Sequence, residues 1–195
     1  MEKEIYIVLT QSGTWMSRFL RLFTKTTYNH SSISLENDLT DMYSFARKYK
    51  YYPFIGGLVR EYPDQGVFGR FPETQAMIFG LTVPTEKYNL LKAHIDEMYA
   101  NRRRWHYNFI GVFLAWFGKS WDRKRCFYCS EFIKDLLIRF DLFPKDVFPR
   151  AVRPLDFSKL FESDLIYQGN LLDYARTMET LKKEETSVHI EDKVV

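Results

Sequence analysis

A cysteine at the expected start of a helix is the residue best placed for nucleophilic chemistry in this sequence. Residues 125–137 read RCFYCSEFIKDLL. After Cys129, apolar residues recur at the spacing of one buried helical face, at Phe132, Ile133, Leu136, Leu137 and Phe140. A helix that begins at Cys129 would place the thiol over free backbone N–H groups and the positive end of the helix dipole, which favours the thiolate.

A thiol nucleophile also needs an imidazole to take its proton, and His30 is the best candidate. It opens the run HSSISLE, in which strand alternation puts His30, Ser32, Ser34 and Glu36 on one face. A polar face that includes the histidine fits the wall of a site better than the wall of a core. The other histidines lie in less suitable settings: His94 on a helix flank, His106 in an aromatic cluster and His189 in the C-terminal segment.

The second cysteine, Cys126, forms a C-x-x-C pair with Cys129. Such a pair can bind zinc or run disulfide exchange. A zinc site would need two further ligands, and no second pair of residues in the chain has ligand spacing. We therefore interpret Cys126 as a core or loop thiol, and we expect no metal and no cofactor.

Strands and helices alternate along the chain and would bring these residues together. Strands are expected at 5–10, 30–36, 42–47, 58–62, 76–83 and 166–169, and helices at 14–23, at 88–99 and from residue 129. The second and third strands would form a hairpin around Asn37 and Asp38. The apolar segment 105–117 is too short to span a bilayer, so it is either a buried helix or a hydrophobic lid beside the site.

Length and composition indicate one globular domain. The chain has 195 residues, of which 46% are hydrophobic, and this is enough to bury one sizeable core. We expect a single α+β domain over 1–177 and a charged tail over 178–195 that is disordered or loosely attached. The formal net charge of +3 is too small to argue by itself for nucleic acid or a membrane as partner.

The chain shows neither a secretory signal nor an integral membrane segment. Its first residues lack the basic start, apolar region and cleavage site of a signal peptide. No stretch approaches the roughly 20 apolar residues that a membrane span requires. We expect a cytoplasmic protein whose two cysteines stay reduced.

Three motifs together resemble the circularly permuted NlpC/P60 group of papain-like thiol enzymes, which includes the YaeF/YiiX-like and lecithin-retinol-acyltransferase-like branches. They are YNHSSISL at 28–35, YSFAR at 43–47 and FYCSEFI at 127–133. In that group the histidine strand precedes the cysteine helix, as it does here. PLDF at 154–157 and YQG at 167–169 also resemble the YaeF/YiiX-like members, so the resemblance spans roughly residues 5 to 175.

The resemblance implies an antiparallel sheet or small barrel packed against helices, with the nucleophile at a helix N-terminus. It also implies a thiolate from Cys129 and a base in His30. The target would be an amide or ester carbonyl in a small-molecule or peptide substrate. That substrate can itself carry an acyl group. An acyl-enzyme would form, with its oxyanion held by N–H groups at the helix start.

The third polar group, which orients the imidazole, is where this sequence departs from the family pattern. That group usually lies on the strand after the histidine strand, where Ser44 is the positional match; Glu36 or Glu61 could reach in instead. Substrate contacts are assigned to Tyr28, Tyr128 and Ser130, which flank the histidine and the cysteine.

Three functions remain open at this stage. The first is a thiol hydrolase that cleaves a peptide or acyl-amide bond. The second is an acyltransferase or lipid hydrolase, because the apolar run 109–117 could receive an acyl chain. The third is a catalytically weak binding module, because the third polar group is missing from its usual strand. The sequence leaves the substrate and the oligomeric state open.

Overall fold

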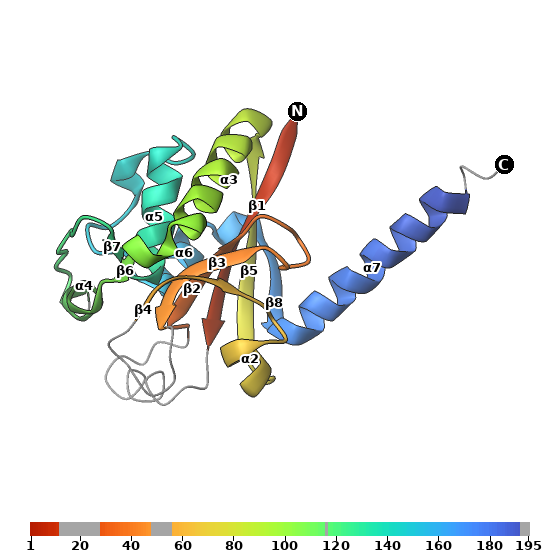
Figure 1. Ribbon diagram of the computed structural model, residues 1–195, viewed down its shortest axis with the longest axis horizontal. Coiled ribbons are helices and arrows are strands. Elements are labelled where there is room, and N and C mark those ends of the chain that lie inside the picture. The colour runs from red at the N-terminus through yellow and green to blue at the C-terminus, as the bar shows by residue number, and fades with distance from the viewer. Residues whose placement is uncertain (12–27, 48–55, 116, 192–195) are drawn as a thin grey trace.

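A six-stranded antiparallel sheet forms the centre of the protein (Figure 1). The computed structural model describes residues 1–11, 28–47, 56–115 and 117–191. The strand order is β4-β3-β2-β1-β5-β8, and every neighbouring pair is antiparallel. The strands are β1 Glu2–Gln11, β2 His30–Ser34, β3 Met42–Arg47, β4 Gly56–Glu61, β5 Gln75–Pro84 and β8 Leu165–Asn170.

Both faces of the sheet are covered, and the sequence of β1 shows why. Its residues alternate between two apolar clusters: Ile5, Ile7 and Leu9 belong to the larger one, and Tyr6 and Val8 to the smaller one. A strand whose residues are apolar at both parities buries both of its faces. β1 is accordingly a central strand with partners on either side.

Three helices cover the larger cluster, and two other helices cover the smaller one (Figure 1). On the first face lie α3 Thr85–Ala100, α5 Cys129–Arg139 and α6 Pro154–Leu160. On the second face lie α2 Gly66–Arg70 and the first turns of α7 Leu171–Glu191. Short 3-10 turns complete the fold at Arg102–Arg104, Lys145–Val147 and Glu162–Asp164.

A small two-stranded sheet stands beside the main one and leads into α5. It pairs β6 His106–Tyr107 with β7 Cys126–Phe127 in parallel. Between the two strands the chain forms α4 Phe109–Ala115 and a connecting loop. The pairing places the end of β7 directly before the first residue of α5.

The sequence predicted the mixed α+β class, the antiparallel sheet and the helix that begins at Cys129, and all three are confirmed. The hairpin of β2 and β3 is also present. The helix expected at 14–23 lies outside the described residues. Within the segment 105–117, α4 is not the wholly buried helix of the first alternative, because it buries Gly111 and Ala115 and exposes Ile110 and Phe113.

The end of the chain differs from the expected loose tail, because α7 continues as a helix to Glu191. Tyr174 is buried against the sheet and Met178 packs beside it. One turn further along, Lys182 Nζ lies 2.6 Å from Asp38 Oδ2, at the turn between β2 and β3. The spacing of four residues puts these three side chains on one face of α7. The many charged residues of this segment make that spacing hard to recognise in the sequence. Among the helices of the described residues, none has the length and apolar character needed to cross a bilayer.

Candidate functional site

The N-terminus of α5 holds Cys129 against the sheet. Tyr128 precedes the helix in an extended conformation, and its N–H donates to Glu131 Oε2 at 3.1 Å, which caps the helix. Phe132 and Leu136 are fully buried and anchor the body of the helix. The Cys129 thiol therefore lies at the first helical position, where N–H groups have no intrahelical acceptor, and only 4% of the residue is exposed.

The histidine strand supplies the group that faces this thiol. His30 is the first residue of β2, and its ring and the Cys129 thiol each shift the pKa of the other. The next residue, Ser31, also helps to lower the pKa of the thiol. The fold thus brings together two candidates that are far apart in the sequence.

A carboxylate from β4 holds the other side of the imidazole. Glu61 Oε1 and Oε2 each lie 3.1 Å from His30 Nε2. Ser32 Oγ donates to Glu61 Oε2 at 2.6 Å and so fixes the carboxylate in turn. The side chains of His30 and Glu61 are only 17% and 13% exposed, so water screens this pair weakly. The imidazole therefore contacts the carboxylate and is electrostatically coupled to the thiol.

The electrostatics of the three groups favour a thiolate and an imidazolium. Burial alone would raise the pKa of Cys129, but the hydrogen bond and charge of His30, helped by the Ser31 backbone, outweigh it and lower that pKa. Burial alone would lower the pKa of His30, but the charge of Glu61 and the contact with Cys129 raise it. The two shifts point in the direction that a thiolate–imidazolium pair requires.

Ser44, the positional match for the orienting residue, does not contact the imidazole. Its Oγ donates to the carbonyl oxygen of Ser31 at 2.8 Å. This bond ties β2 to β3 where their ladder ends, since the two strands pair only at Ile33 with Tyr43 and Ser34 with Met42. Of the two acids considered as alternatives, Glu61 contacts His30, whereas Glu36 lies past the end of β2 and is exposed.

The three residues assigned to substrate contacts are all buried. Ser130 Oγ donates to the carbonyl oxygen of Val152 at 2.9 Å. Tyr128 packs with Ala115 and Ala151, and burial raises the pKa of its hydroxyl. Tyr28 belongs to the larger core cluster. In the structure these three residues pack or form hydrogen bonds within the protein interior.

Cys126 lies in β7 and is a free, buried cysteine, as is Cys129. Within the described part of the chain, no group of three or more His, Cys, Asp and Glu residues is arranged to hold a metal ion. The zinc arrangement considered for the C-x-x-C pair therefore has no further ligands among these residues.

Asn108 is fully buried and has a role that its sequence context does not predict. Its Oδ1 accepts the Gly111 N–H at 2.9 Å and caps α4, while its Nδ2 lies 3.3 Å from Glu131 Oε2. Asn108 thereby joins the cap of α4 to the cap of α5. A single amide within an aromatic run carries no spacing signal, so only the structure reveals this link. Ser32, by contrast, shares the strand face of His30 and could have been found by alternation.

Comparisons of this chain with protein-family models, with curated proteins and with solved structures found no match. The resemblance to the permuted NlpC/P60 group stays a prediction from the sequence motifs.

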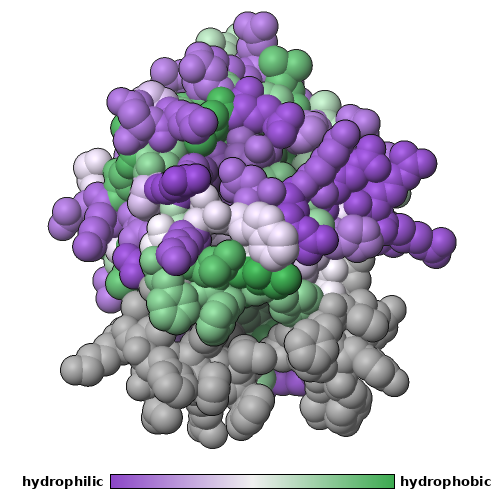
Figure 2. Space-filling view, turned by 90° about the vertical axis from the view of Figure 1, so that its left-hand side faces the viewer, coloured by the Kyte–Doolittle hydropathy of each residue, from purple (hydrophilic) through white to green (hydrophobic). Residues whose placement is uncertain are grey.

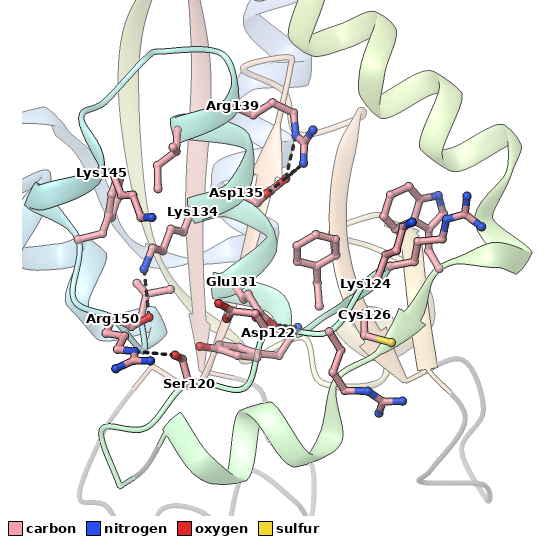
Figure 3. Close-up of a pocket in the computed structure, with 18 of the residues that line it drawn as sticks. Ser120, Asp122, Lys124, Cys126, Glu131, Lys134, Asp135, Arg139, Lys145 and Arg150 are labelled. Carbon is pink, nitrogen blue, oxygen red and sulfur yellow. Dashed lines mark hydrogen bonds and ion pairs between the residues drawn. The ribbon is translucent and has the colours of Figure 1, made fainter.

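A wide cleft of about 1380 Å³ lies beside α5 and next to α4 (Figure 3). Its lining includes Cys126, Tyr128 and Glu131 but, among the described residues, not Cys129. Burial raises the pKa of Glu131 to about 7. Seven Lys and Arg residues and four Asp and Glu residues line the cleft, so cations predominate in it.

Proposed function

We propose that this protein is a thiol hydrolase that cleaves an amide bond, in a peptide or an acylated amine, through an acyl-enzyme on Cys129. The observation that carries the proposal is the coupling of the Cys129 thiol to His30, whose imidazole contacts Glu61. Papain-like enzymes need these three functions: a nucleophile, a base and a group that fixes the imidazole. The histidine strand before the cysteine helix agrees with the order in the permuted NlpC/P60 group.

The roles of the three residues follow from the geometry. Glu61 occupies Nε2 of His30, which leaves Nδ1 to take the thiol proton. The thiolate attacks the carbonyl carbon and forms a C–S bond. The oxyanion is stabilised by free N–H groups of the first turn of α5. The imidazolium then gives its proton to the leaving nitrogen as the C–N bond breaks.

Water completes the cycle. It attacks the thioester while the imidazole takes one of its protons, and the C–S bond breaks to release the acid and restore the thiolate. Because Glu61 favours the imidazolium form, it stabilises the ion pair from which the thiolate attacks and the later transition state in which the imidazole takes a proton from water.

The proposal is tested by trapping the acyl-enzyme. The protein is mixed with an activated acyl ester, and mass spectrometry then locates the thioester. We expect the acyl group on Cys129 in the wild type and in Cys126→Ser, and no acylation in Cys129→Ala. Acylation that occurs only on Cys126 would overturn the assignment. Turnover is then sought with a panel of peptidyl and N-acyl coumarin amides.

Acyl transfer or lipid hydrolysis is the second candidate, and one observation favours it. α4 exposes Ile110 and Phe113 on its outer face, while Ala115 on its inner face packs with Tyr128, the neighbour of Cys129. The helix that exposes this apolar surface therefore packs against the residue that precedes Cys129. Turnover of short peptidyl amides without turnover of lipid esters would argue against this candidate.

The third candidate, a weak binding module, rests on the absence of a third polar group from β3. Glu61 supplies such a group from β4. A Cys129 thiol of ordinary reactivity, with a pKa near the usual value of about 8.5, would favour this candidate over an enzyme.

A further inference from the structure

Four large apolar side chains on and just after α4 are exposed and lie close together in the sequence. Ile110, Phe113, Phe117 and Trp121 are 46%, 63%, 66% and 45% exposed. The rings of Phe113 and Phe117 pack edge to face, with centroids 5.4 Å apart. Figure 2 shows a hydrophobic area, with hydrophilic side chains above it, on the side of the molecule that carries α4. Concentrated exposed apolar surface of this kind marks an interaction site.

Cations follow these apolar residues along the chain. The loop after α4 carries Lys119, Arg123, Lys124 and Arg125, all exposed, against one acid, Asp122. The last three of these cations also line the cleft shown in Figure 3, where seven Lys and Arg residues meet four acids. The whole chain has 28 Lys and Arg residues and 25 Asp and Glu residues. The lining of this cleft therefore holds a positive excess as large as that of the entire sequence.

Two of the four acids of the cleft already have partners within the protein. Asp135 is paired with Arg139 at 3.0 Å. Glu131 accepts hydrogen bonds from the Tyr128 N–H and from Asn108. In the described part of the chain, Lys124, Arg125 and Lys145 have no ion-pair partner. The cleft thus retains uncompensated positive charge.

We propose that this face, the apolar residues of α4 with their cationic border, docks on the surface of a bilayer that contains anionic phospholipid. Aromatic and aliphatic side chains next to Lys and Arg are the combination that inserts at the level of lipid head groups. A second copy of the chain is a poorer occupant. A symmetric contact through α4 would bring two cationic borders together, and like charges oppose association.

This docking goes beyond the proposed function and does not depend on it, because no step of it uses the thiol. It has a consequence for the site all the same. The inner face of α4 packs with Tyr128, and Asn108 joins the caps of α4 and α5. A bilayer bound at α4 would therefore lie next to the helix that carries Cys129.

The test is co-flotation of the full chain with vesicles of phosphatidylcholine and phosphatidylglycerol, compared with vesicles of phosphatidylcholine alone. We expect binding to the anionic vesicles only, and weaker binding as salt rises. The double variant Phe113→Ser/Phe117→Ser should lower the partition coefficient at least about tenfold. Lys124→Gln should lower it about fivefold, because each cation near an anionic surface contributes about that factor.

Two control variants separate the alternatives. Leu90→Ser removes a side chain that is 55% exposed on α3, away from α4, and should bind as the wild type does. Cys129→Ala should also bind unchanged, so a failure of the enzyme proposal leaves this one standing.

Three outcomes would overturn the proposal. The first is no binding of the wild type to anionic vesicles, and the second is wild-type binding by the Phe113→Ser/Phe117→Ser variant while circular dichroism shows it folded. The third is a dimer in sedimentation that this variant abolishes, without any vesicle binding.

Discussion

Replacing Glu61 with glutamine removes one charge from the imidazole while keeping the length and shape of the side chain. In the wild type both carboxylate oxygens lie 3.1 Å from His30 Nε2. A glutamine amide that donates to Nε2 would force the ring proton onto Nδ1, which faces the thiol in our proposal. The variant therefore removes the charge and favours the wrong tautomer.

The size of the effect follows from the distance. Two unit charges 3.1 Å apart attract by about 5 kcal/mol at an effective dielectric constant of about 20, an upper limit before desolvation is counted. Observed shifts from one such neighbour are about 1–3 pKa units. We expect the pKa of His30 to fall by that amount and, because the charge of His30 lowers the pKa of Cys129, the thiol pKa to rise with it.

The assay is the rate of alkylation by iodoacetamide as a function of pH. It is run in a Cys126→Ser background, so that Cys129 is the only thiol in the chain. In the wild-type site the rate should already be high well below the ordinary thiol pKa of about 8.5. In Glu61→Gln the midpoint should move upward by about 1–3 pH units.

Glu36→Gln is the matched control, because Glu36 is exposed and lies beyond the end of β2. Its pH profile should coincide with that of the wild type. Ser32→Ala, which removes the 2.6 Å hydrogen bond to Glu61, should give a smaller shift in the same direction. Identical profiles for Glu61→Gln and Glu36→Gln would refute the role assigned to Glu61.

Three further predictions concern the support of the site. Ser44→Ala should lower the free energy of unfolding by about 1–3 kcal/mol, because the buried Ser31 carbonyl loses its 2.8 Å donor; an altered alkylation profile would mean that Ser44 acts on the imidazole after all. Asn108→Asp places a second carboxylate about as close to Glu131 as the amide is now, 3.3 Å. It should cost up to about 5 kcal/mol above neutral pH, at an effective dielectric constant of about 20, and less in acid; equal urea midpoints at both pH values would contradict this. The pKa of Glu131 is raised from 4.5 to about 7 by burial, so the folded state binds more protons than the unfolded state between these values and stability falls as pH rises through them. Glu131→Gln should remove this pH dependence of the free energy of unfolding, which amounts to about 1–2 kcal/mol after allowance for solvent screening. Urea titrations at both ends of the pH interval measure it. An unchanged pH dependence would assign it to another group.

The sequence predicted the parts of the site that depend on local pattern. The apolar spacing after Cys129 located the start of α5, and alternation in β2 placed His30 on a polar face. The orienting group could not be chosen in this way. Glu61 and His30 lie on strands that are not neighbours in the sheet, and which of several acids reaches the ring depends on how β2 and β3 diverge.

The helix caps and the exposed face of α4 could not be predicted from local sequence pattern either. Asn108 lies in an aromatic run where nothing in the spacing distinguishes it, and its partner Glu131 follows it by 23 residues. The sequence also did not predict that one face of α4 is exposed, because an apolar segment of that length is equally compatible with a buried helix. Local periodicity finds elements, whereas side-chain contacts between distant elements require the three-dimensional fold.

The contact between α7 and the β2–β3 turn bears on where the folding unit ends. Composition suggests a boundary after residue 177, but Lys182 lies beyond it and pairs with Asp38, whose side chain is only 5% exposed. A protein trimmed at that boundary would keep a buried carboxylate and lose the ammonium group beside it, a costly arrangement. The penalty would fall on the turn of the hairpin that carries His30. The autonomous unit therefore extends at least one helical turn past the last residue that hydrophobicity would include.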